Sequence, residues 1–155
     1  METIIQILAA TVGTIGFCLM FNTNPKHIVI PAIGGGLCWA IYLYMRHLGL
    51  SIFLATFIAS ALIGIYGEIF AHLCKMPTTV CFMPSCVPLI PGSNLYYALG
   101  GLLARDWTVL RENTTLLVWY AIGIAAGLAL IYELDSVRLR IEARIALRRG
   151  DGAKV

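Results

Sequence analysis

Long apolar runs separated by brief polar breaks are the main feature of this chain. Four runs are long enough to cross a bilayer as helices, because a span needs about 20 apolar residues to cover a hydrocarbon core of roughly 30 Å. They cover residues 4–21, 27–45, 50–74 and 114–133. The polar connectors between the first three are short, so we expect successive spans to be antiparallel neighbours. The pattern therefore predicts an all-α integral membrane protein.

Residues 77–104 form a further apolar segment that fits neither one straight span nor two. As one helix its 28 residues would be about 42 Å long, whereas each half would reach only about 21 Å. It contains Pro84, Pro88 and Pro91, the last followed by Gly92. A proline removes a backbone donor and clashes with the preceding turn, so we expect a fourth crossing that is broken at its Pro-Gly motif. Backbone freed at membrane depth must be buried by protein or reached by water, and the break therefore indicates a cavity or a pathway.

Composition and the placement of charge give the orientation. The chain is 59% hydrophobic and 12% charged, whereas an average soluble domain has about 25% charged residues. With five spans, Lys26, Lys75 and the six basic residues of the tail share one side, eight of the eleven Lys and Arg residues. The other side holds Arg46, Arg105 and Arg111. Because Lys and Arg are enriched in cytoplasmic loops, we expect the tail in the cytoplasm and the N-terminus outside. If residues 77–104 turned back, the division would be seven to four and the tail would keep its side.

Two regions follow from this reading: a transmembrane domain over residues 1–135 and a basic cytoplasmic tail over residues 136–155. From Val137 to Ile145 the tail alternates apolar and charged residues, which is a strand pattern. Its Ala, Leu, Arg and Glu content favours a helix instead, continuing from the last span with no breaker before Gly150. Its charge sets the topology, and a contact with anionic membrane lipid is the alternative role.

The stretch 88–97 carries the densest polar signal inside the apolar part of the chain. The prolines end one helical half, and Gly92, Ser93 and Asn94 are good residues to begin another. A helix N-terminus at membrane depth presents unpaired N–H groups and a partial positive charge, which suit a carboxylate. The candidate substrate-binding residues are Pro88, Pro91, Gly92, Ser93, Asn94, Tyr96 and Tyr97. The alternative is a structural kink, for which one proline would be enough.

Glu68 lies inside the third predicted span. A carboxylate below the membrane surface could carry a proton in coupled transport. The alternative is a pairing of Glu68 with Lys75 or with His72, which is four residues further along the same helix face. Both interpretations are open on the sequence alone.

Other classes of function find little support. The five cysteines are odd in number and unpaired in spacing, so we expect small buried hydrophobes rather than disulfides or a metal site. Three scattered histidines and the lack of an HExxH or a triad argue against an enzyme, and we expect no cofactor, no metal and no nucleic-acid partner. The glycines at 34–36 lack the strand and lysine of a phosphate loop and favour close helix contact. Asn22 and Asn24, in the first connector, are read as solvated loop residues, with a gate or partner contact as the alternative.

The order of these features resembles a known family. It comprises the run Gly16 to Asn22, then Pro25, a glycine-bearing second span, Pro77-Thr78, and Ile90-Pro91-Gly92 with Tyr96. The chain resembles the small subunit of the threonine/serine exporter family, found in bacterial two-component exporters for amino acids or succinate. The likeness covers residues 5–135, and its most specific piece is 88–97.

This resemblance implies a larger membrane subunit as partner, since fused members carry both halves in one chain. It also implies a secondary transporter in the bacterial inner membrane that exports threonine and serine or dicarboxylates such as succinate, with proton coupling through Glu68 as an expectation. An odd number of spans per half would place two related halves in opposite orientations. The alternatives are a homo-oligomer, or a channel-forming or structural membrane subunit that stabilises a partner.

Overall fold

The computed structural model describes the backbone of residues 1–75 and 77–148, and the side chains as far as Glu133 except at position 76. Six α-helices follow one another: α1 (Glu2–Met20), α2 (Val29–His47), α3 (Ile52–Cys74), α4 (Thr78–Cys86), α5 (Gly92–Leu103) and α6 (Trp107–Arg148). Two short 3₁₀ helices, η1 (Pro25–His27) and η2 (Val87–Leu89), precede α2 and follow α4. The described residues contain no strand, and the all-α prediction is confirmed.

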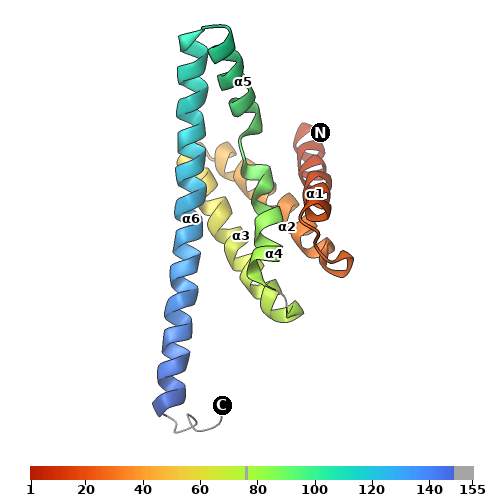
Figure 1. Ribbon diagram of the computed structural model, residues 1–155, viewed down its shortest axis with the longest axis vertical. Coiled ribbons are helices and arrows are strands. Elements are labelled where there is room, and N and C mark those ends of the chain that lie inside the picture. The colour runs from red at the N-terminus through yellow and green to blue at the C-terminus, as the bar shows by residue number, and fades with distance from the viewer. Residues whose placement is uncertain (76, 149–155) are drawn as a thin grey trace.

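Four helical stretches of the described chain are long and apolar enough to cross a membrane: Glu2–Met20, Pro25–His47, Ile52–Cys74 and Trp107–Glu133. They correspond to the four predicted spans. The fourth crossing comes in pieces, because α4 and α5 run in the same direction, one after the other (Figure 1). As a result, the N-terminus and the end of α6 lie at opposite ends of the bundle (Figure 1).

The last span begins earlier than the sequence pattern suggested. Residues 105–113 look like a polar connector, but α6 already starts at Trp107. Asp106 explains the difference, because its Oδ1 accepts hydrogen bonds from the backbone N–H groups of Thr108 (3.0 Å) and Val109 (3.2 Å) and so caps the new helix. At the other end α6 continues to Arg148, so the helix predicted for the start of the tail is present. Residues 149–155 of the tail lie outside the described residues.

Small residues bring α3 and α6 into close contact. Three pairs make it: Thr56 with Gly123, Ser60 with Gly127, and Gly64 with Ile131. A Cβ added to Gly127 would overlap Ser60 Oγ and lie 2.7 Å from a backbone oxygen of α3, so no larger residue fits there. The two members of each pair rise together in number, which shows that α3 and α6 run parallel. This is the small-residue packing that membrane helices use for close approach.

The glycines at 34–36 make a second close contact, as the sequence indicated. A Cβ on Gly35 would overlap the Thr14 hydroxyl of α1, and one on Gly34 would overlap the Ser85 hydroxyl of α4. The Ser85 hydroxyl donates a hydrogen bond to the Pro31 carbonyl (3.1 Å), which joins α4 to α2. Helix α2 is therefore the centre of the bundle, with α1, α3 and α4 around it.

The core lies where α2, α3 and η2 meet. Its buried members are Cys38, Tyr42, Ala55, Ala59, Ile63, Cys86 and Leu89. The hydroxyls of Tyr42 and Tyr120 hydrogen-bond to each other and so tie α2 to α6. Four of the five cysteines are buried and all five are free thiols, which confirms the sequence interpretation of buried hydrophobes.

Helix α5 and the first part of α6 extend beyond the ends of α1, α2 and α3 (Figure 1). The start of α3 lies beside Trp119 of α6, whose ring makes an edge contact with Phe53 at a centroid distance of 6.3 Å. Residues 107–118 therefore continue for about 18 Å past α3. In the described chain α5 packs mainly on this stretch, and a Cβ on Gly101 would lie only 2.8 Å from the Leu110 backbone nitrogen.

Candidate functional site

The break in the fourth crossing lies at Ile90 and Pro91. Helix α4 ends at Cys86 and η2 at Leu89, Ile90 is extended (φ −68°, ψ 120°), and α5 begins at Gly92. Pro84 lies inside α4 without ending it, so the helical path stops at the Pro-Gly motif. This confirms a crossing broken at its Pro-Gly motif.

The first turn of α5 has no side-chain cap, and Pro91 occupies the position before it. The leading N–H groups of a helix have no partner within the helix and carry a partial positive charge. The N–H group of Gly92 bonds back to the Ile90 carbonyl at 2.8 Å. The N–H group of Leu95 bonds to the Pro91 carbonyl at 3.1 Å, so the N–H groups of Ser93 and Asn94 are those that the helix start leaves for another partner. That they bind an anionic group stays a prediction.

The structure distributes the predicted binding residues over three surroundings. Pro88 lines a cavity of about 280 Å³ together with Gln6, Ala9, Ala10 and Trp39 of α1 and α2. In that cavity Trp39 Nε1 donates to Gln6 Oε1 at 3.4 Å. The break is therefore adjacent to a small polar pair on the α1 side.

Asn94 faces the opposite way, towards α6. Its Nδ2 donates to Asn113 Oδ1 at 3.3 Å, and Asn113 Nδ2 donates in turn to the Val109 carbonyl at 2.9 Å. Ser93, Tyr96 and Tyr97 lie on the exposed surface of α5, where the two tyrosine rings meet edge to face. The seven residues thus do not form one closed pocket in the described chain, and their role in binding stays a prediction.

Glu68 is half-buried on α3. It follows Gly64 by four residues, which places it on the face of α3 that packs on α6. His72 Nδ1 lies 3.0 Å from the backbone carbonyl oxygen of Glu68. Pairing of the Glu68 carboxylate with Lys75 or His72 stays a prediction, and so does proton coupling by this carboxylate.

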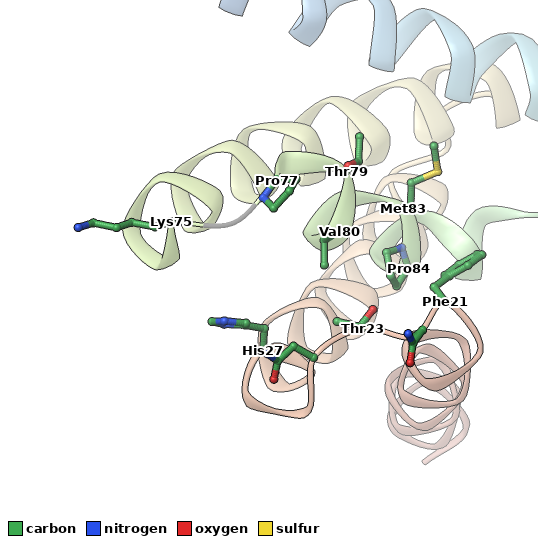
Figure 2. A pocket seen from close by; sticks show the side chains of 11 residues that line it. Phe21, Thr23, His27, Lys75, Pro77, Thr79, Val80, Met83 and Pro84 are labelled. Atoms are coloured by element: carbon green, nitrogen blue, oxygen red, sulfur yellow. The ribbon is translucent and has the colours of Figure 1, made fainter.

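A larger cavity lies at the end of the bundle where α1 joins α2 and α3 joins α4. Its volume is about 440 Å³, and residues 21–24 and 27 line one side while residues 75, 77, 79, 80, 83 and 84 line the other. Figure 2 shows His27 and Lys75 extending to the same side of this cavity, away from Met83 and Pro84. Sequence reasoning missed it because its two walls are about fifty positions apart. The only signal was the pair of asparagines in the first connector.

Comparison with known proteins bears on what this architecture does. A family model described as Threonine/Serine exporter, ThrE, matches residues 6–133, which include most of the first long span, the other three and the broken crossing. The chain belongs to the threonine/serine exporter family. A protein of Haemophilus influenzae that is described only as uncharacterized is 28% identical to this chain over 99 residues. That match covers 64% of the chain and 33% of the relative, so it spans about a third of the relative's length. No solved structure matches the chain.

Membership of an exporter family confirms the resemblance seen in the sequence and makes this chain a multi-pass membrane protein of a transport family. The matched range ends at Glu133, at the end of the last apolar span. The break at Ile90 and Pro91 and the end cavity both lie inside the matched range. A cavity of about 760 Å³ along the first part of α6, lined by Trp107, Arg111, Thr115 and Trp119 among others, lies in that range too.

Proposed function

We propose that this exporter chain is one part of a secondary transporter that moves threonine, serine or a small dicarboxylate such as succinate out of a bacterium across its inner membrane. The observation that carries the proposal is the family match over residues 6–133, which spans the whole apolar part of the chain. The broken crossing inside that range supports it, because transporters bind their substrates where membrane helices are interrupted.

In this proposal the substrate carboxylate binds at the start of α5. The first N–H groups of the helix and the Ser93 hydroxyl would hold it, and the helix dipole would favour its charge. Threonine, serine and succinate all carry such a carboxylate. Because Ser93 and Tyr96 are exposed in this chain alone, the site is an open half that a second subunit would close.

A larger membrane subunit is the partner that fits this open half. Helix α5 and the first part of α6 extend beyond the ends of α1, α2 and α3 (Figure 1). Large apolar side chains of α5, among them Leu95, Leu99 and Leu103, are exposed there and could pack on a second membrane protein. We therefore place the larger subunit against α5. A second copy of this chain or lipid alone are the alternatives that the experiment below separates.

The distribution of charge supports a cytoplasmic C-terminus. The connector that holds Lys26, the connector at Lys75 and the end of α6 all lie at one end of the bundle (Figure 1). The connectors near Arg46 and Arg105 lie at the other end (Figure 1). The end richer in basic residues would face the cytoplasm. In this orientation the end cavity opens to the cytoplasm and the start of α5 lies further towards the outside.

Efflux of preloaded labelled threonine, serine and succinate tests the proposal in cells without native exporters. The chain would be expressed alone, with the larger subunit, and not at all, and its amount in the membrane would be measured in each case. Efflux of one compound only when both chains are present is the expected result. Efflux from this chain alone would favour a homo-oligomer. No efflux in either case, with the protein present in the membrane, would contradict the proposal and favour a structural subunit.

A channel is the second candidate function, and its support is the water-accessible backbone that a helix break implies. It differs from the exporter in its driving force. Channel-mediated efflux would follow the gradient of the solute alone, whereas the proposed exporter would slow when a protonophore removes the proton gradient. The same cells and labelled compounds therefore distinguish the two functions.

A further inference from the structure

We propose that the cavity at the cytoplasmic end of the bundle is an access site, in which Lys75 and His27 hold the carboxylate of a small substrate before it enters the pathway. The inference rests on the proposed function for the class of ligand and for the side of the membrane. It assigns a second binding place, at the opposite end of α4 from the break.

The size of the cavity suits this role. Its volume of about 440 Å³ lies within the range of roughly 300–1,000 Å³ that is typical of small-molecule sites. Its walls come from two connectors and from α4, namely residues 21–24, 27, 75, 77, 79, 80, 83 and 84. It is therefore a feature of the folded bundle rather than a groove along one helix.

The charges around the cavity favour an anion. Lys75 is exposed and His27 is half-buried, and both extend to its outer side (Figure 2). No Asp or Glu is among the described residues that line it. A carboxylate at this mouth would meet cationic side chains without a competing acidic neighbour, and the ammonium of Lys75 can rotate towards it because its side chain is exposed.

The inner wall offers hydrogen bonds and apolar contact to the rest of the solute. Asn22, Thr23 and Thr79 contribute an amide and two hydroxyls, while Val80 and Met83 contribute apolar surface. Asn24 is already engaged, because its Oδ1 accepts a hydrogen bond from the backbone N–H group of Lys26 at 3.2 Å. A few polar groups in a mostly apolar wall are typical of sites for small ligands. This mixture suits a small carboxylate that also carries a hydroxyl or an amino group.

Helix α4 connects the access site to the break. Its first turns, from Thr79 to Met83, line the cavity, and η2 follows α4 up to Leu89. Pro84 belongs to the cavity wall, and the next residue, Ser85, is buried against Gly34 of α2. The two proposed binding places therefore lie at the two ends of one short helical segment. A solute leaving the cytoplasm would meet the access site first and the break second.

Protection of an introduced thiol tests the access site without requiring transport. Thr79→Cys, in a Cys74→Ala background, would be placed in the full chain purified in detergent with its larger subunit, and its reaction rate with a hydrophilic maleimide would be measured. We expect threonine, serine or succinate at millimolar concentration to slow this reaction several-fold. Met83→Cys is a second reporter in the same wall, and Ala104→Cys, at the far end of the bundle, should react at an unchanged rate.

Charge variants show whether the cavity or the general surface charge is responsible. Lys75→Gln and His27→Gln should abolish the protection, whereas Lys26→Gln should retain it, because Lys26 lies on the same connector as His27 but does not line the cavity. The proposal is overturned if none of the three compounds protects the thiol of the Thr79→Cys or the Met83→Cys reporter, or if Lys26→Gln removes protection as fully as Lys75→Gln. Efflux without protection would leave the exporter standing and remove the access site. Protection without efflux would support the binding site in the cavity and contradict the proposed exporter.

Discussion

The two halves of α6 have different surroundings, although they belong to one continuous helix. In the lower half, after Trp119, Gly123 and Gly127 let α6 approach α3 until hydroxyls of α3 touch its backbone. In the upper half, before Trp119, α6 has mainly α5 as its neighbour, and an Asn94–Asn113 hydrogen bond joins the two helices. The lower half is a close packing surface. The upper half holds α5, which exposes Leu95, Tyr96 and Leu99 in the described chain.

Filling the lower contact should have the largest effect. Gly127→Leu would force side-chain atoms into Ser60 and the backbone of α3, and overpacking of this kind typically destabilises by about 1–3 kcal/mol. We expect a much lower amount of protein in the membrane and a lower unfolding temperature in detergent. Gly100→Leu on α5 is the matched control, because nothing lies within 4 Å of a Cβ at that position. Equal losses from both variants would mean that the loss comes from a leucine at an exposed or buried glycine alike, and not from the contact of Gly127 with α3.

Removing the break should abolish export while leaving the core intact. Pro91→Ala restores a backbone donor and allows α4 and α5 to approach a continuous helix, which would displace the start of α5. A displaced binding group lowers the rate on the order of 10²-fold, and we expect a loss of that size in labelled efflux. Gly100→Ala on the same helix should export normally. Normal efflux by the Pro91→Ala variant would show that the break has no part in transport.

A substitution of Glu68 tests whether the contact between α3 and α6, which stabilises the fold, also includes a group that carries a proton. Glu68→Gln keeps the size of the side chain and removes its ionisation. Under the proposed coupling we expect efflux that follows the solute gradient and no longer responds to a protonophore. Glu112→Gln, on the exposed surface of the upper half of α6, should keep the response of the native protein. A protonophore response that is unchanged in Glu68→Gln would assign the coupling to another group.

The hydrogen bond of the upper half should have the smallest effect. A double-mutant cycle of Asn94→Ala and Asn113→Ala measures it, and hydrogen bonds between membrane helices average about 0.6 kcal/mol. We expect a coupling energy near that value from unfolding in detergent. If both single variants unfold at only slightly milder conditions than the native chain while their efflux falls, the hydrogen bond serves export more than stability. A coupling of several kcal/mol would instead make α5 and α6 as rigid a unit as α3 and α6.

Features that depend on neighbouring residues in the sequence were predictable. The four long spans follow from local hydropathy, and the interruption at Pro91 and Gly92 follows from the missing donor of proline. The start of α6 was misplaced because a single cap at Asp106 outweighed the polar character of the residues that follow it. The uncapped helix start after the break is also present, whereas its binding of an anion stays a prediction.

Contacts between distant residues were decided only by the tertiary structure. No local pattern states that Thr56 lies against Gly123, or that Asn94 turns towards α6 while Ser93 and Tyr96 turn outward. The end cavity likewise exists only because two connectors far apart in the sequence meet at one end of the bundle. The sequence by itself determined which segments enter the membrane and where one of them breaks, because hydropathy and proline act locally. Helix packing decided which side chains share a cavity, because small residues on separate helices must meet before any site can form between them.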